Sequence, residues 1–531
     1  MNKKNIIQQL KNNNRNFYIL LLITFIFILF SHPFLKYPYD MWNHLIRIDD
    51  VYTENKIIHY RENWYLFWAE TFHLFSIDDF FIRARIIHIV QTIICLFSVF
   101  LFSRVLIRNI FKDINSTNLN YLSYWSVLIW LTIYATHSMY THQVWIMWYS
   151  ISYQISLAFF WYITALTLIL FLEELNWPIK LFYCIQVVFF SYVMLSIHPM
   201  ELGYYFVYLS LLGIVFFDKI INFVRVNFRI FIPATLAVIA LLYYFFNYHF
   251  NYNDKIPPVV QFINDGLFVQ LYETIMRNGM ASIDGGNRAS TSINELMVVI
   301  FFIGLFFFVD VVRKKILNVG SNVHFRLFLF IIISALFVIT PLFQFTAGLL
   351  AVFFSVGVVN RVYYSSSLYV LLPISVYYFW STYNQKVSLS KINISVIFII
   401  LSTFFYSRFF SESHNYYKNV MSLVNSFDER KVGFQLSQDN IETIGVLLDK
   451  YEKDILKNGK KVTYFARSDV SLVLKYIYKR DVYQELAWNG APPPKTFEHF
   501  AVYSKDPKVL KTKIPIIFRI PRSFPRYIPY R

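Results

Sequence analysis

The stretch ARIIHIVQTIICLFSVFLFSRVLI, residues 84–107, decides the fold class of this protein. A helix needs about 20 mostly apolar residues to cross the hydrocarbon core of a bilayer, and this run is long enough. Similar runs recur along the 531-residue chain, which is 56% hydrophobic and only 15% charged, with a mean hydropathy of +0.44. Because a soluble domain carries about 25% charged residues, the sequence predicts a polytopic α-helical membrane protein.

About eleven transmembrane helices are predicted from these apolar runs. The first run has the length of a signal peptide, but no small-residue cleavage site follows it, so we expect a retained anchor. The predicted spans are residues 17–35, 84–107, 121–139, 150–172, 181–198, 202–218, 229–248, 296–312, 326–345, 366–383 and 391–410.

The basic residues predict the orientation of the chain in the membrane. Much of the net charge of +17 lies in short loops and in the C-terminal tail, so it does not indicate a nucleic-acid partner. Basic loops stay in the cytoplasm, so we expect the N-terminus inside and, after an odd number of spans, the C-terminus outside. The cytoplasmic basic groups are Lys3, Lys4, Lys11 and Arg15; Arg104, Arg108 and Lys112; Lys219, Arg225 and Arg229; Arg313, Lys314, Lys315 and Arg326; and Lys386 and Lys391.

Three polar pieces share the outer side in this topology. Two of them, loops 36–83 and 249–295, belong to a transmembrane domain of residues 1–410, and the third is the C-terminal segment 411–531. Only this last segment is long enough for a separate domain. We expect a small extracytoplasmic α/β domain there, because KKVTYFA (460–466) and HFAVYS (499–504) are typical of strands and DVSLVLKYIYKR (469–480) of a helix.

The first outer loop contains an aromatic stretch at roughly helical spacing. Its aromatic residues are Trp64, Phe67, Trp68, Phe72 and Phe75. Such a helix would lie along the membrane interface with its aromatic face toward lipid, or it would pack under a longer loop. The sequence leaves both interpretations open.

The start of the same loop, HPFLKYPYDMWNHLIRIDD (residues 32–50), carries the strongest candidate chemistry. Asp40, His44 and Arg47 share one face if this stretch is helical. A carboxylate at a membrane surface can act as a general base on an acceptor hydroxyl, and the neighbouring cations can bind a phosphate. Capping of a helix by Asp40 or a local salt-bridge cluster would produce the same spacing.

Other candidate residues lie far away in the sequence. His198 and Glu201 occupy a tight outer turn between two spans, and Arg288 lies in the second outer loop, where IDGGNRAS is polar enough for a substrate-covering loop. Arg361 enters a late apolar run, where an unpaired guanidinium is costly, so it needs a carboxylate or a bound phosphate as its partner.

The chain resembles the GT-C fold family of membrane glycosyltransferases. YDMWNHLIRI (residues 39–48) is similar to the Asp-x-x-x-His-Leu-x-Arg run of several bacterial members, and the order of spans and outer pieces is similar over nearly the whole chain. The resemblance implies that Asp40 is the catalytic base and that Arg361 holds a polyprenyl phosphate. His44, Arg47, His198, Glu201 and Arg288 are further candidates for binding the donor phosphate or the substrate.

The same resemblance implies a reaction and a place for it. The expected function is transfer of a sugar, with inversion, from a polyprenyl-phosphate donor on the outer face of the bacterial inner membrane. Asp40 is followed by Met41 rather than by the Glu of the protein mannosyltransferases, which favours a glycan or lipid-linked glycan acceptor over a protein. The sequence demands no metal or other cofactor, although Asp40, Asp49 and Asp50 are hard oxygen ligands that suit a divalent cation.

Other functions are consistent with parts of the sequence. A lipid-linked glycan polymerase would use outer-loop arginines, but it usually lacks a large outer C-terminal segment such as 411–531. A transporter or flippase of lipid-linked sugars would need ionisable residues near the bilayer midplane and often internal repeats, whereas the charged residues here cluster at the outer edge. A structural membrane-assembly protein is the remaining alternative.

Overall fold

The computed structural model describes most of the predicted helical regions. The described residues are 62–135, 152–219, 295–317, 322–338, 343–354, 365–383 and 388–410, with further positions within 44–52, 221–236, 273–277, 416–421 and 441–449, and the short stretches 463–466, 473–480, 482–484 and 499–501. Backbone packing divides the chain into two compact units. The first contains residues 1–22, 93–147 and 152–422, and the second contains residues 23–92, 148–151 and 423–531.

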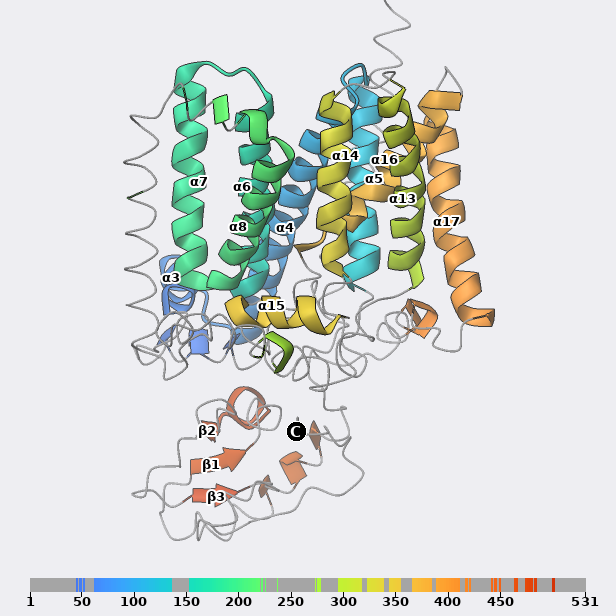
Figure 1. Ribbon diagram of the computed structural model, residues 1–531. Coiled ribbons are helices and arrows are strands. Elements are labelled where there is room, and N and C mark those ends of the chain that lie inside the picture. Colours follow the sequence, from blue (N-terminus) through green and yellow to red (C-terminus); the bar gives the residue numbers. More distant parts are fainter. Residues whose placement is uncertain are drawn as a thin grey trace, which may run out of the picture. The chain divides into compact units, whose positions relative to one another are not determined.

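Helices dominate the described residues (Figure 1). They are α3 (Glu62–Leu74), α4 (Phe80–Ile110), α5 (Ser116–Ala135), α6 (Ser152–Leu172), α7 (Trp177–Ile197), α8 (Pro199–Val215), α13 (Glu295–Ile316), α14 (Asn322–Ala335), α15 (Gln344–Phe354), α16 (Leu368–Tyr383) and α17 (Leu389–Phe409).

Within the described residues, five helices are long and apolar enough to cross a membrane: α4, α6, α7, α13 and α17. Helix α7 shows why a membrane is needed, because large apolar side chains such as Ile185, Val188 and Phe189 are 57%, 69% and 57% exposed. A soluble protein rarely exposes a contiguous apolar surface of this kind. The helices are therefore those of an α-helical membrane protein.

Most predicted spans coincide with a helix, to within a few residues at each end. Helices α4, α5, α6, α7, α8, α13, α16 and α17 match eight of them. Residues 17–35 and nearly all of 229–248 lie outside the described residues.

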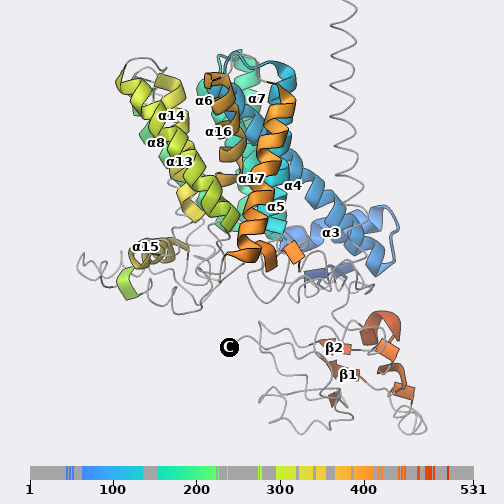
Figure 2. The ribbon, with the colours of Figure 1, turned by 90° about the vertical axis from the view of Figure 1, so that its right-hand side faces the viewer.

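The structure differs from the prediction at the span 326–345. Helix α14 stops at Ala335, a 3-10 turn covers Leu336–Val338, and a separate helix, α15, begins at Gln344. Pro341 lacks an amide hydrogen and disfavours helical geometry in the residue before it, so a single helix through this region is not expected. Helix α15 lies across one end of the long helices of its unit, at a steep angle to them (Figures 1 and 2).

The first unit is held together by close helix–helix packing. Gly304 of α13 faces α16 so closely that a Cβ atom there would come within 2.1 Å of the Leu371 side chain. Buried hydroxyls join α14 to the residues just before α16: the Ser334 and Ser367 oxygens are 2.5 Å apart, and Ser366 donates to the Ala335 carbonyl. Small and hydroxylic residues at helix interfaces are typical of membrane bundles.

The described part of the C-terminal segment contains a small parallel sheet. Strands β1 (Thr463–Ala466), β2 (Val482–Gln484) and β3 (His499–Ala501) pair in the order β2-β1-β3. In the register, Tyr464 pairs with Val482 and with Phe500. Strands β1 and β3 lie within the predicted strand stretches 460–466 and 499–504, and the described part of the predicted helix 469–480 contains a short π-helical turn, η6 (Val473–Ile477).

Candidate functional site

The aromatic helix of the first outer loop packs into the protein. Trp64, Trp68 and Phe72 of α3 are at most 5% exposed, whereas Phe67 and Phe75 are 62% and 66% exposed. The i, i+4, i+8 spacing puts the first three on one buried face. For these three residues the packed interpretation holds, and the lipid-facing one does not.

This buried face holds His44. The His44 Nδ1 atom lies 2.6 Å from the Tyr65 hydroxyl, and the two rings are stacked with centroids 5.9 Å apart. The Trp64 ring meets His44 edge-on. The described residues around His44 are helical, which is the condition under which His44 and Arg47 would share a face. Helix α3 positions the His44 imidazole.

Arg47 is buried one turn after His44. The residue is 7% exposed, and the Nε atom of its guanidinium has no hydrogen-bond partner in the described part of the chain. A buried charged donor left without an acceptor is costly. Arg47 is therefore a candidate for binding an anion.

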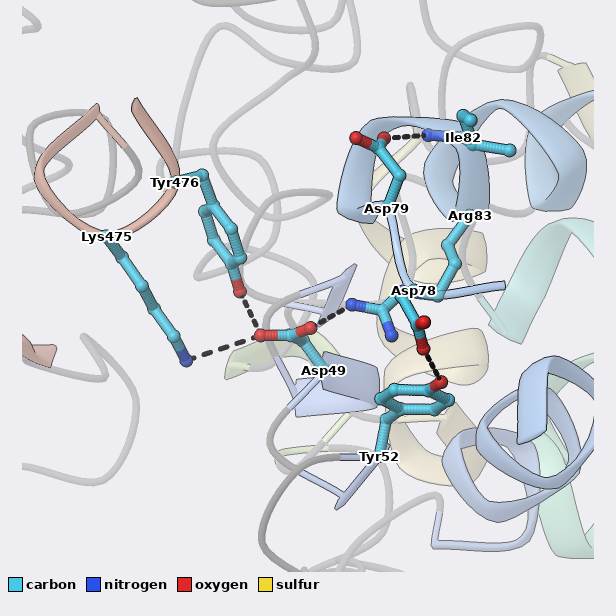
Figure 3. A network of polar contacts seen from close by, with 8 residues as sticks. All are labelled: Asp49, Tyr52, Asp78, Asp79, Ile82, Arg83, Lys475 and Tyr476. Atoms are coloured by element: carbon cyan, nitrogen blue, oxygen red, sulfur yellow. Dashed lines mark hydrogen bonds and ion pairs between the residues drawn. The ribbon is translucent and has the colours of Figure 1, made fainter. Parts of the chain in front are cut away.

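Among the described residues of the second unit, the carboxylate of Asp49 is buried, 3% exposed, and contacts several cations and hydroxyls (Figure 3). Its Oδ1 accepts a hydrogen bond from Arg83 Nη2, in the first turn of α4. Its Oδ2 accepts from the Tyr476 hydroxyl and lies 3.4 Å from Lys475 Nζ, both in η6. Asp49 thus joins three segments that are far apart in the sequence.

A second carboxylate supports the same arginine indirectly. The Arg83 guanidinium lies 4.2 Å above the centre of the Tyr52 ring, a favourable cation–π position. The Tyr52 hydroxyl in turn donates to Asp78. This hydrogen bond, with a contribution from burial, raises the pKa of Tyr52 above its ordinary value. Tyr52 therefore remains a neutral donor beside the arginine at physiological pH.

The start of α4 is built to present Arg83. Asp79 caps the helix, because its Oδ1 accepts from the Ile82 amide at 2.8 Å, the N-cap pattern that acidic residues favour. Arg83 follows one residue later and is 4% exposed. Its Nη2 is paired with Asp49, while its Nη1 has no hydrogen-bond partner among the described residues. A guanidinium can donate hydrogen bonds to a phosphate from such nitrogens.

His198 and Glu201 form a separate pair in the first unit. His198 ends α7 and precedes Pro199, the first residue of α8. Its Nδ1 lies 2.5 Å from Glu201 Oε2, and the two residues are only 5% and 2% exposed. Ser156 of α6 donates to the His198 carbonyl at 3.0 Å. The pair therefore ties three helices together at one turn, and it also keeps a titratable dyad in a buried position.

The predicted site residues fall into three groups. The structure brings His198 together with Glu201, and in the second unit it gives both His44 and Arg47 helical backbone, with His44 partly buried and Arg47 buried. Asp40, Arg288 and Arg361 lie outside the described residues, as does Asp50. Within the described ranges no three His, Cys, Asp or Glu side chains are grouped to hold a metal ion.

Three residues of the Asp49 network were not among the candidates from the sequence. These are Arg83, Lys475 and Tyr476. Arg83 carries a signal that was available, since a guanidinium in the first turn of an apolar span is unusual. Lys475 and Tyr476 carry none, because Tyr476 and Asp49 are 427 positions apart.

Comparison of the chain with protein-family models, with curated proteins and with solved structures finds no match.

Proposed function

We propose that this protein is a membrane glycosyltransferase of the GT-C kind. It transfers a sugar from a polyprenyl-phosphate donor to a glycan or lipid-linked glycan. The observation that carries the proposal is Arg83, a buried guanidinium with one nitrogen held by Asp49 and Nη1 without a hydrogen-bond partner among the described residues. Its depth along α4, the charge around it and the chemistry of the donor all support this function.

The position of Arg83 along α4 suits a lipid phosphate. Helix α4 has 31 residues, which at 1.5 Å per residue is about 46 Å. The hydrocarbon core is only about 30 Å thick, so the ends of α4 extend into the headgroup layers. Arg83 lies in the first turn and therefore at the depth where phosphates of membrane lipids lie.

The charge of the Asp49 cluster suits an anionic ligand. Arg83 and Lys475 carry two positive charges against the single negative charge of Asp49, a net of +1. A polyprenyl phosphate bearing a sugar is a phosphodiester with one negative charge, which this balance neutralises.

The chemistry requires a base and a stabilised leaving group. The departing polyprenyl phosphate gains charge, and donors already oriented toward it lower the barrier without reorganisation. Arg83 supplies such a donor. Both Asp49 oxygens are engaged by Arg83, Tyr476 and Lys475, so Asp49 organises cations and is poorly placed to accept a proton. Asp40 remains the base that we propose for the acceptor hydroxyl, with inversion at the sugar.

The proposed topology has eleven spans in the bacterial inner membrane. The N-terminus is cytoplasmic, and loops 36–83 and 249–295 and the C-terminal domain 411–531 are periplasmic. The further candidates for binding the donor phosphate or the substrate are those that the resemblance implies: His44, Arg47, His198, Glu201, Arg288 and Arg361. A reporter that is active only in the cytoplasm should stay silent when fused after Arg531, and a strong signal would refute this orientation.

Binding of polyprenyl phosphate tests the proposal without knowledge of the sugar. In nanodiscs, the protein should bind polyprenyl phosphate more tightly than the uncharged polyprenol. Loss of a hydrogen bond to a charged group is worth about 1.5–3 kcal/mol, so Arg83→Gln should weaken phosphate binding by about 10- to 100-fold, and Arg83→Lys by less. Arg85→Gln, which changes an exposed arginine on the same helix, is the matched control.

Three outcomes would contradict the proposal. Equal binding of polyprenyl phosphate and polyprenol would mean that the protein has no site for the phosphate. Unchanged binding by Arg83→Gln would mean that Arg83 does not contact the phosphate. Tighter binding of polyprenyl diphosphate than of the monophosphate would favour the polymerase instead. Transfer from a radiolabelled hexosyl phosphoryl polyprenol to membrane acceptors then tests the reaction itself.

A further inference from the structure

We infer that Tyr476 and Lys475, in the C-terminal turn η6, belong to the donor site as positioning residues for Arg83. They act through Asp49, whose carboxylate they hold in a fixed orientation. The inference rests on the proposed function, because it assigns the C-terminal segment a role in the same phosphate site. It goes beyond that function, which needs only Arg83 itself.

Tyr476 is inserted at the junction of two segments of the second unit. Its ring stacks on Phe80, the first residue of α4, with centroids 3.8 Å apart and planes 13° from parallel. Phe81 meets it edge-on. The hydroxyl at the end of this ring donates to Asp49 Oδ2. The stacking therefore aims the hydroxyl at the carboxylate.

The carboxylate needs this support to orient the arginine. The terminal torsion of an Asp side chain has a broad energy profile, so a single contact at Oδ1 would leave the group free to turn. Tyr476 and Lys475 engage Oδ2 from one side while Arg83 engages Oδ1 from the other (Figure 3). Fixing both oxygens fixes Arg83 Nη2, and with it the direction in which Nη1 points. Supporting contacts of this kind determine how well a binding group is preorganised.

The turn that carries Tyr476 is itself anchored. The Tyr478 hydroxyl donates to the Ile441 carbonyl at 2.6 Å, and Tyr478 packs against Gly445, where a Cβ atom would come within 2.5 Å of its hydroxyl oxygen. The side chains of Val473 and Leu474 are buried. The C-terminal segment thus presents Tyr476 from a packed turn rather than from a free end.

Two tyrosines of this turn give a matched pair of variants. Tyr476→Phe keeps the ring that stacks on Phe80 and removes only the hydroxyl that reaches Asp49. Tyr478→Phe removes a hydroxyl two residues away that holds the turn through the Ile441 carbonyl. If the turn matters only for folding, both variants should act alike. If Tyr476 positions the site, only Tyr476→Phe should change the affinity for phosphate.

The experiment measures polyprenyl phosphate binding and thermal unfolding of the full chain in nanodiscs. We expect Tyr476→Phe and Lys475→Met each to weaken binding by about 3- to 10-fold, because misplacement of an orienting group by a fraction of an ångström is costly. Tyr478→Phe should lower the unfolding temperature while leaving the dissociation constant within about twofold of the wild type, because its hydroxyl supports the turn and not the carboxylate. In a transfer assay, Tyr476→Phe should raise the donor KM more than it lowers kcat.

The outcomes separate this inference from the proposed function. If Arg83→Gln loses phosphate binding but Tyr476→Phe and Lys475→Met bind as the wild type does, the positioning role is wrong and the phosphate site stands. If Tyr476→Phe and Tyr478→Phe lose binding equally, the turn is only structural and the inference is again wrong. If Arg83→Gln binds polyprenyl phosphate as tightly as the wild type does, both the proposed function and this inference are wrong.

Discussion

Asp49 and Arg83 lie 34 positions apart in the sequence and form an ion pair whose two side chains are only 4% and 5% exposed. Such a pair contributes little when both partners are present, because desolvation offsets the attraction. Removal of one partner of the pair has a much larger effect on stability. A single substitution leaves the other charge buried without its counterion.

Replacement of Asp49 tests this asymmetry. Asp49→Asn leaves Arg83 without its counterion, and the expected loss is about 3–5 kcal/mol of unfolding free energy. Thermal unfolding in detergent measures it. Asp78→Asn is the control, since Asp78 is exposed and its carboxylate accepts a hydrogen bond from the Tyr52 hydroxyl; its loss should stay near about 1 kcal/mol. Equal losses in the two variants would mean that the Asp49 pair is not buried as the structure has it.

Replacement of Asp40 tests the proposed base. Asp40→Asn keeps the shape and most of a helix-capping role, which costs at most about 1 kcal/mol. General-base catalysis is worth about 100- to 10,000-fold. The variant should therefore reach the membrane and bind polyprenyl phosphate normally, while sugar transfer falls by orders of magnitude. Near-normal transfer would redirect the search to Asp50 or Glu201.

Replacement of Gly304 tests the packing of α13 on α16. Gly304→Ala places a methyl group against Leu371, and overpacking typically costs about 1–3 kcal/mol. Leu371→Ala in the same chain should recover part of this loss, so the double variant should be more stable than the sum of the single changes predicts. Val309→Ala, at a 59% exposed position of α13, should cost no more than about 0.5 kcal/mol. Additive losses for the Gly304 and Leu371 changes would contradict the close contact.

Replacement of Tyr52 tests the hydrogen bond to Asp78 through its pH dependence. The pKa of Tyr52 is raised in the folded state, mainly by that hydrogen bond. A raised pKa means that the folded state holds the proton more tightly, so the stabilisation is complete below the ordinary tyrosine pKa of about 10 and is lost as the pH rises through the folded value.

The unfolding temperature of the wild type should therefore fall above about pH 10 more steeply than that of Tyr52→Phe, which has no proton to lose at this position. Asp78→Asn should reduce the slope in the same way, since it removes the main cause of the shift. Identical slopes in all three proteins would show that the hydrogen bond does not form.

The positions of most helices follow from local features of the sequence. Length and apolar character are local properties of a segment, so residues 84–107 and seven other runs predict helices that the structure contains. Local signals also predicted the strand at Thr463–Ala466. The predicted span 326–345 is wrong as a single helix. The prediction rested on the apolar character of the whole run and gave no weight to Pro341, which lacks the amide hydrogen that a continuous helix needs.

Which charged residues meet depends on the tertiary packing. The face of α3 that is buried, and the pairing of Asp49 with Arg83 and Tyr476, depend on segments up to 427 positions apart. A periodic pattern says that two residues of one helix share a face, but it carries no information about which distant segment packs against that face. The burial that leaves Arg83 Nη1 without a partner among the described residues arises only when those segments come together, because desolvation is a property of the assembled site and not of the residue.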